Sequence, residues 1–363
     1  MKNLVKGYFK RNLGDDLFLK ILAERYPNEK FEVYSSDTYN GVYKTKNIKF
    51  HSTKNWLNII RVLINKIFKM LGIKKNLLIE DLKRYDNIIL IGGSIFMEND
   101  NMDFDMYAKR MFNYKYNNYI LGANFGPYHT EEFVNVHKKQ IFPNLKDICF
   151  RDVYSFDLFK ELKNVRHASD IVFGLNVSKI GKESNNIAII SIIDVTKDNM
   201  NYSQEKYNNS IKKIITFLKS KGMKIILMSF SKSQGDEIVI NQIISSLEDK
   251  TNVESYFYRG NIEESLDILS RSKVVFGTRF HANILGLLLG KNVVPIAYSD
   301  KTINVFNDMN FKGKIFDIRD DDMFNVDELN ENDINYLHDV TFQITDAKRH
   351  FEALDKIFYK EEK

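Results

Sequence analysis

The sequence is poor in cysteine and has no long apolar run, and each shortage excludes a class of protein. A single cysteine, Cys149, stands among 363 residues. This excludes a disulfide framework and any zinc or iron–sulfur site built on cysteines, and it favours a reducing compartment. No stretch reaches the roughly 18 uninterrupted apolar residues of a membrane-spanning helix. The first residues, MKNLVKGYFKRNLGDD, lack the apolar segment of a secretory signal, so we expect a cytoplasmic location.

The charge balance gives little support to a nucleic-acid partner. The chain has 53 Lys and Arg against 48 Asp and Glu, a formal net charge of +5. That excess is small for the length and comes with no nucleic-acid-binding motif, so we expect no such partner. Hydrophobic residues make up 44% and charged residues 28% of the chain, which is enough to bury large cores. The length fits two domains.

Strand-like apolar runs alternate with helical patterns in two series, separated by the polar segment 176–186, NVSKIGKESNN. This alternation predicts two doubly wound α/β domains of Rossmann type, each with a parallel sheet. We expect an N-terminal domain over residues 1–178 and a C-terminal domain over 187–340. Two helices are expected at the C-terminal end, with residues 341–363 packing back across the domains.

Residues 54–75, KNWLNIIRVLINKIFKMLGIKK, predict an amphipathic helix that contains no acidic residue. At 100° per residue, Lys54, Arg61 and Lys69 fall on one arc of this helix. The opposite face is apolar and comprises Trp56, Ile60, Leu63, Ile67, Met70 and Leu71. A basic amphipathic helix of this kind binds membrane interfaces. The alternative is a helix packed on the sheet, with its basic face in solvent.

Ligands of open α/β sheets bind beyond the carboxyl ends of the strands, where loops enter helices. Several polar or glycine-rich junctions fall at such places in this sequence. They contain Asn12, Gly14 and Asp15; Gly92, Gly93 and Ser94; Asn124; Arg151; Thr278, Arg279 and His281; and Lys301.

Each junction also has a purely structural interpretation. Asp15 fits a helix N-cap, and Gly92-Gly93 lacks the full G-x-G-x-x-G spacing of a dinucleotide site. Arg151 fits an ion pair with Asp152 or Asp157 as well as a ligand contact. A lone histidine such as His281 is more often structural than catalytic.

The segment GTRFHAN, residues 277–283, places Arg279 and His281 between an apolar strand and an apolar helix. Free N–H groups and the dipole at a helix start favour an anion, and the same dipole disfavours a cation there. We therefore expect Arg279 to face a negatively charged carboxylate or phosphate. His281 is suited to donate a proton near neutral pH. Together the two residues predict an anion pocket that contains a proton donor.

These motifs, in this order, resemble the polysaccharide pyruvyl transferase family. The resemblance covers residues 12 to about 311 and rests on NLGDD, GGSIF, LGANFGPY, RDVYS, SDIVF, GTRFHANILGLLLGKNVVPIAY and SDKTINVFNDMNF. It implies a GT-B-like fold of two Rossmann-type domains facing a cleft. It also implies transfer of the enolpyruvyl group of phosphoenolpyruvate onto two hydroxyls of a glycan sugar. The product that the resemblance implies is a cyclic pyruvate ketal in a bacterial surface polysaccharide.

The resemblance assigns the catalytic roles to His281, Arg279 and Arg151 and a substrate-binding role to Lys301. The other junction residues are expected to bind substrate as well, namely Thr278, Gly92, Gly93, Ser94, Asn12, Gly14, Asp15 and Asn124. Asn124 stands where the family often has glutamine, and Thr278 and Phe280 replace commoner neighbours of the Arg-x-His pair. These departures bear on the acceptor more than on the reaction.

The expected partners are phosphoenolpyruvate and a glycan acceptor, which the family's setting allows to be linked to polyprenyl diphosphate. No metal and no cofactor are expected, because phosphoenolpyruvate is itself the donor substrate. Two other functions remain open on the sequence. One is a GT-B glycosyltransferase that uses a nucleotide sugar, and the other is a non-catalytic glycan-binding relative.

Overall fold

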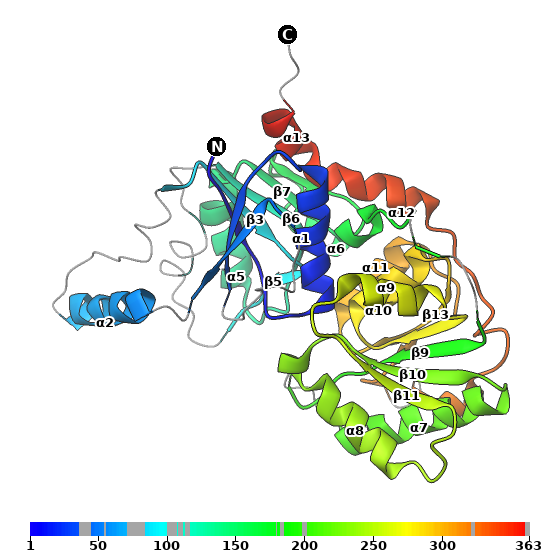
Figure 1. Ribbon diagram of the computed structural model, residues 1–363. Helices are drawn as coiled ribbons and strands as arrows, with labels where there is room; N and C mark the ends of the chain where they lie inside the picture. The colour runs from blue at the N-terminus through cyan, green and yellow to red at the C-terminus, as the bar shows by residue number, and fades with distance from the viewer. Residues whose placement is uncertain are drawn as a thin grey trace. The chain divides into compact units, whose positions relative to one another are not determined.

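The computed structural model divides the chain into two compact units, each with its own parallel sheet (Figure 1). The residues that the structure describes are 1–35, 45–53, 56–70, 84–99, 107, 112, 117–178, 180–181, 185–197, 202–320 and 324–359. The first unit comprises residues 1–10, 18–171 and 348–363, and the second comprises 11–17 and 172–347. Residues 11–17, near the start of the chain, thus belong to the second unit.

The first unit contains an eight-stranded sheet in the order β3-β2-β1-β4-β6-β7-β8, with β5 paired to β6. Its strands are β1 (Asn3–Lys6), β2 (Phe31–Ser35), β3 (Ile48–Ser52), β4 (Asn87–Ile91), β5 (Ser94–Phe96), β6 (Asn117–Phe125), β7 (Asp147–Phe150) and β8 (Val165–His167). Its helices are α2 (Trp56–Met70), α5 (Glu131–Val136), α6 (Val153–Asp157), α13 (Glu352–Phe358) and most of α1 (Leu13–Arg25). The β-branched and aliphatic run NIILI of β4 is wholly buried, as expected for a central parallel strand.

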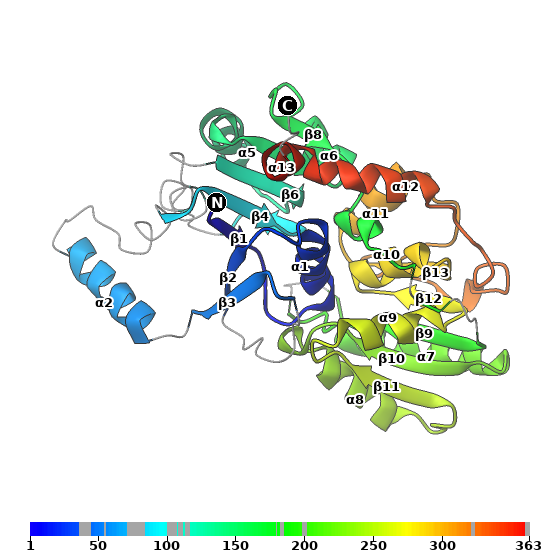
Figure 2. The same cartoon turned by 45° about the horizontal axis from the view of Figure 1, so that its top comes forward.

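The second unit contains a six-stranded sheet in the order β11-β10-β9-β12-β13-β14. Its strands are β9 (Ile187–Ser191), β10 (Lys224–Ser229), β11 (Val253–Phe257), β12 (Val274–Gly277), β13 (Asn292–Ala297) and β14 (Phe316–Asp317). Its helices are α7 (Gln204–Ser220), α8 (Asp236–Ser246), α9 (Ile262–Ser270), α10 (Phe280–Leu288), α11 (Asp300–Asp308) and α12 (Thr341–Asp346). Helices α7 and α8 cover one face of this sheet, and α9 and α10 cover the other (Figure 1, Figure 2).

In both sheets the strand order reverses beside the strand that comes first in the chain. The reversal lies between β1 and β4 in the first sheet and between β9 and β12 in the second. All strand pairs of the two sheets, as far as the structure describes them, are parallel, so the carboxyl ends of neighbouring strands meet at one edge. Doubly wound sheets bind their ligands at this switch point. The expected fold class of two doubly wound parallel-sheet units is confirmed.

Helix α2 leaves apolar side chains exposed. Ile60 is 40% exposed, Leu63 and Ile67 are each 53% exposed, and Met70 is 86% exposed. These four side chains do not pack on the sheet, so the packed alternative does not hold for this face. The helix is described over 56–70, and the expected residues 54–55 and 71–75 lie outside the described residues.

The C-terminal end contains two helices, as expected, and both are short. Residues 332–340 form turns and extended chain, and helix begins only with α12. A 3-10 turn, Ala347–Phe351, then joins α12 to α13. No described helix is both long and apolar enough to cross a membrane.

His137 is buried in the aromatic core of the first unit. Its Nδ1–H donates to the carbonyl of Phe133 at 2.7 Å, and its ring lies 5.0 Å from that of Phe125 and 5.2 Å from that of Phe142. Among the described residues Nε2 has no hydrogen-bond partner. Protonation at Nε2 would place a charge among aromatic rings, and burial accordingly lowers the pKa of His137 to about 4.

This lowered pKa predicts that acid destabilises the protein. Below about pH 6.5 the unfolded chain binds a proton at His137 and the folded chain does not, so the free energy of unfolding falls as the pH falls. Between about pH 7.5 and 5 this one group accounts for about 2 kcal/mol. Urea unfolding at the two pH values measures the loss. His137→Phe should reduce the loss of unfolding free energy, whereas the control His129→Phe, at an exposed position, should not. Equal losses in the wild type and both variants would show that His137 is not the cause.

Candidate active site

The switch point of the second sheet brings together the end of β9 and the loop after β12. Arg279 follows β12, and its backbone N–H donates to the hydroxyl of Ser191, the last residue of β9, at 3.0 Å. Thr278, fully buried beside it, exchanges a hydrogen bond of 2.9 Å with the hydroxyl of Tyr207 on α7. These bonds fix Arg279 and His281 at the start of α10, as the sequence predicts.

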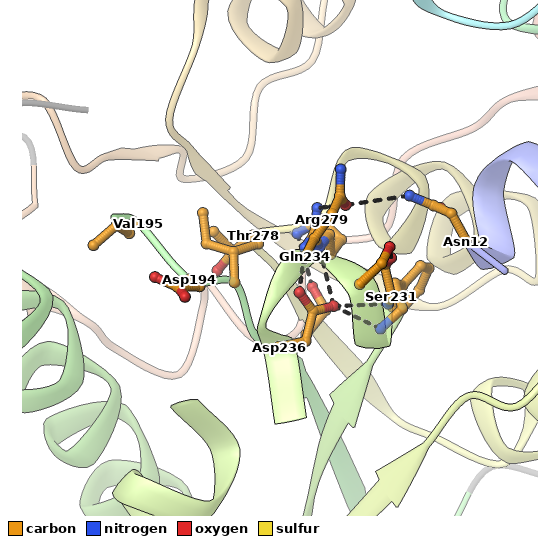
Figure 3. A network of polar contacts seen from close by, with 12 residues as sticks. Asn12, Asp194, Val195, Ser231, Gln234, Asp236, Thr278 and Arg279 are labelled. Atoms are coloured by element: carbon orange, nitrogen blue, oxygen red, sulfur yellow. Dashed lines mark hydrogen bonds and ion pairs between the residues drawn. The ribbon is translucent and has the colours of Figure 1, made fainter. Parts of the chain in front are cut away.

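The guanidinium of Arg279 is paired with the carboxylate of Asp236 (Figure 3). Nη2 donates to Oδ1 of Asp236, Nε donates to Oδ2 at 3.2 Å, and Nη1 donates to Oε1 of Gln234 at 2.5 Å. Oδ2 of Asp236 also accepts the backbone N–H groups of Phe230 and Ser231, each at 2.9 Å. Asp236 is fully buried.

This pair changes the interpretation of Arg279. The negative charge that the sequence leads us to expect beside it is present in the protein, as Asp236. The two charges cancel, so Arg279 contributes directed N–H donors to the site and little net positive charge. Because a buried carboxylate is tolerated only when it is paired and hydrogen-bonded, Asp236 and Arg279 each depend on the other.

The start of α1 is joined to the loop after β10, within the second unit. Leu13 N donates to the carbonyl of Phe230 at 3.0 Å, and Asn12 Nδ2 donates to Gln234 Oε1 at 3.3 Å. Asn12 Oδ1 in turn accepts the N–H of Gly14 at 3.0 Å. Asn12 therefore caps α1, and Asp15 lies inside the first turn, so the interpretation of Asp15 as the cap is wrong.

His281 packs directly on the first turn of α1. A Cβ atom at Gly14 would lie 1.9 Å from Nδ1 and 2.6 Å from Cγ of His281, far inside van der Waals contact. Only glycine leaves room for the imidazole at this point. The neighbouring Phe280 ring, 5.1 Å away in a T-shaped arrangement, packs on the same imidazole.

Lys301 lies at the carboxyl end of the next strand, in the first turn of α11. Its ammonium donates to the hydroxyl of Tyr298 at 2.9 Å and lies 4.8 Å from the centre of that ring. This partner is neutral, so the Lys301–Tyr298 pair keeps a full positive charge. In this respect Lys301 differs from Arg279.

The first unit holds a second group of the expected residues, around Arg151. Nη1 of Arg151 donates to Asp170 at 3.1 Å, and Nη2 donates to Asn124 Oδ1 at 2.6 Å, which also accepts from Ser94 at 3.2 Å. A Cβ atom at Gly93 would lie within 2.6 Å of the guanidinium. The Arg151 side chain is only 2% exposed, so its direct role in the structure is to orient Asn124.

Arg151 thus forms a buried ion pair with Asp170, an acid that the sequence analysis does not name as its partner. Asp152 instead caps α6, where it accepts the N–H of Ser155 at 2.8 Å. Gly92 adopts φ +150°, a conformation that favours glycine, at the turn between β4 and β5.

Sequence reasoning missed Asp236, Gln234 and Asp170. Asp170 lies within the motif SDIVF, but the motif alone gives no indication that this aspartate pairs with Arg151. Asp236 opens α8, where its only sequence signal was a helix-start aspartate. Asp16, the residue after Asp15, is fully buried and accepts from the Tyr258 hydroxyl at 2.6 Å.

The expected residues thus form two groups, one in each unit. Asn12, Gly14, Thr278, Arg279 and His281 meet in the second unit, and Lys301 lies at the end of the neighbouring strand β13. Gly93, Ser94, Asn124 and Arg151 meet in the first. Within the described residues, no group of three or more His, Cys, Asp or Glu side chains is arranged to hold a metal ion.

Two solved structures resemble the whole fold. MnaA of S. aureus, bound to UDP, superposes with a TM-score of 0.60 at 11% identity and covers 99% of this chain and 96% of its own. HepE of Anabaena, bound to UDP and glucose, gives 0.54 at 12% identity, with 99% and 97% covered. At such identities the likeness concerns the fold alone, which is GT-B-like.

Sequence relatives are more specific. The amylovoran biosynthesis protein AmsJ of Erwinia amylovora is 21% identical over 270 residues, which cover 66% of this chain and 63% of AmsJ. The chain therefore spans less than two thirds of that relative. The sequence model of the polysaccharide pyruvyl transferase family matches residues 12–300. This range includes every candidate site residue except Lys301. The chain belongs to the polysaccharide pyruvyl transferase family.

Proposed function

We propose that the protein transfers the enolpyruvyl group of phosphoenolpyruvate onto two hydroxyls of a glycan sugar, which forms a cyclic pyruvate ketal. One observation carries this proposal: in a chain of this family, His281 and Arg279 stand together at the start of α10, at the switch point of the second sheet. The reaction needs an anion site and a proton donor in the same place.

The donor carries a carboxylate and a phosphate, and we assign it to the second unit. Lys301 supplies net positive charge there, and the N-termini of α10 and α11 add partial positive charge. The neutral Arg279–Asp236 pair supplies N–H donors in fixed directions. A preorganised donor set of this kind stabilises the charge that develops on departing phosphate.

His281 acts as the general acid. Its imidazolium gives a proton to the methylene carbon of the enol, which leaves an oxocarbenium-like carbon that an acceptor hydroxyl attacks. The first hydroxyl gives its proton to the imidazole that has just lost one as the new C–O bond forms. The second hydroxyl then closes the ketal and displaces phosphate, and its proton leaves with the phosphate. One positioned acid contributes on the order of 10²–10⁴ in rate.

We assign the acceptor to the first unit, where Ser94 and Asn124 lie at the carboxyl ends of β4 and β6 beside the buried Arg151–Asp170 pair. The acceptor is a glycan of a bacterial surface polysaccharide, carried on polyprenyl diphosphate at the cytoplasmic side of the membrane. Amylovoran, which names AmsJ, supports a polysaccharide product.

Ligand binding distinguishes this proposal from the alternative that the protein is a nucleotide-sugar glycosyltransferase. That alternative is tested because the two similar structures contain UDP. We expect phosphoenolpyruvate to raise the melting temperature, because a ligand at about 100 times its Kd stabilises the folded state by about 2.7 kcal/mol. Thermal-shift titration with phosphoenolpyruvate, UDP and inorganic phosphate measures this. A shift with UDP alone would overturn the donor assignment, and no shift with any of them would favour the non-catalytic relative.

The role of His281 predicts a selective loss of chemistry. His281→Gln should lower kcat by about 10²–10⁴ while donor binding changes little, since Arg279 and Lys301 remain. The assay is phosphate release and ketal formation on a panel of synthetic glycans, read by mass spectrometry. His129→Gln, in the other unit and exposed, is the control. Wild-type turnover in a folded His281→Gln protein would refute the role.

The contact between Gly14 and His281 predicts an effect at a residue that carries no functional group. Gly14→Ala should displace the imidazole, because the new methyl would occupy its position, and kcat should fall by about tenfold or more. Gly174→Ala is the matched control, since its nearest neighbour would lie 3.9 Å away, an ordinary contact. If both variants keep full activity, the position of His281 on α1 does not matter to the reaction.

A further inference from the structure

Helix α2 has an exposed apolar arc. Ile60, Leu63, Ile67 and Met70 are all exposed, and at 100° per residue they fall within an arc of about 80°. The partly buried positions Ile64 and Phe68 lie on a different arc of the helix. At 1.5 Å per residue, the arc extends over about 15 Å along the helix, from Ile60 to Met70. A contiguous exposed apolar strip of this length indicates a binding surface.

The chain's positive charge is concentrated in the stretch of sequence that contains this helix. Residues 38–79 contain nine Lys or Arg and no Asp or Glu. Because the whole chain carries +5, the remaining residues together carry a net charge of −4. By helical position, Lys66 falls on the arc that adjoins Met70, and Lys69 falls on the face opposite the apolar arc. Long basic side chains beside an apolar surface can extend toward charged groups.

We infer that α2 binds the surface of an anionic lipid bilayer, with Ile60, Leu63, Ile67 and Met70 in the interface and the surrounding lysines on lipid headgroups. The combination of an apolar arc with a basic, acid-free remainder is the pattern of interfacial helices. A second copy of the chain is the competing occupant. Pairing of two α2 helices would bring two strongly basic stretches together, and like-charge repulsion opposes that contact.

The inference does not depend on the reaction, because it requires only the exposed arc and the charge. If the acceptor is linked to a lipid, binding of α2 would hold the enzyme at the surface where that acceptor lies. Failure of vesicle binding would leave the proposed chemistry untouched, and absence of the chemistry would leave vesicle binding untouched.

Vesicle sedimentation with the full chain, in the absence of substrate, tests the inference. We expect binding to vesicles of phosphatidylcholine and phosphatidylglycerol in equal parts, weaker binding to phosphatidylcholine alone, and release by salt. Leu63→Asn with Ile67→Asn should weaken binding by about tenfold or more. The control, Leu337→Asn with Phe342→Asn, removes side chains that are 61% and 70% exposed in the second unit, and it should bind as the wild type does.

A second pair of variants tests the charge. Lys66→Gln with Lys69→Gln should lose roughly thirtyfold on the anionic vesicles, about fivefold per lysine, and little on neutral ones. The control Lys312→Gln with Lys348→Gln should be unchanged. The inference is overturned if the wild type does not sediment with anionic vesicles, or if test and control variants bind alike. It is also overturned if light scattering finds a dimer that only Leu63→Asn with Ile67→Asn dissociates, since α2 would then bind a second copy.

Discussion

The ion pair between Arg279 and Asp236 is the interaction on which the second unit's site depends. It joins the loop after β12 to the start of α8, and the backbone N–H groups of Phe230 and Ser231 complete the shell of the carboxylate. A buried pair of this kind contributes modestly to stability as a pair, yet loss of one partner costs about 3–5 kcal/mol, because the other charge is left buried. The pair therefore fixes the geometry of the site more than it stabilises the fold.

That geometry extends to the imidazole through Gln234, Asn12 and the first turn of α1. Gln234 accepts from both Arg279 and Asn12, and Asn12 caps the helix whose Gly14 supports His281. A proton donor and an anion-binding group are thus oriented by one continuous chain of contacts. Such preorganisation is what makes positioned acids and N–H donors effective in catalysis.

Local patterns in the sequence were sufficient for the sheets and for the position of the Arg279–His281 pair. The apolar run of β4 and the loop after β12 each carry their own signal. The edge strands β8 and β14 have only three and two residues, which are too few for an apolar period to appear in the sequence. Asp236 was missed for another reason: it lies 43 residues from Arg279, and only the pairing of β10, β9 and β12 brings them together.

The same limit explains why the sequence does not show the compensation of the Arg279 charge, although it does show the excess charge of residues 38–79. Whether Arg279 is compensated depends on a distant carboxylate, which the sequence does not locate. The excess charge of residues 38–79 can be read from the sequence, because this stretch contains nine Lys or Arg and no Asp or Glu. The fold nevertheless brings one carboxylate to it, since Glu32 Oε2 lies 3.2 Å from His51 Nε2. Arginines at the two sites are neutralised by Asp236 and Asp170, so they add nothing to the net field. The long-range attraction of this protein for anionic surfaces is therefore set by the stretch that contains α2. The attraction for a small anionic donor is set by Lys301 and the helix N-termini.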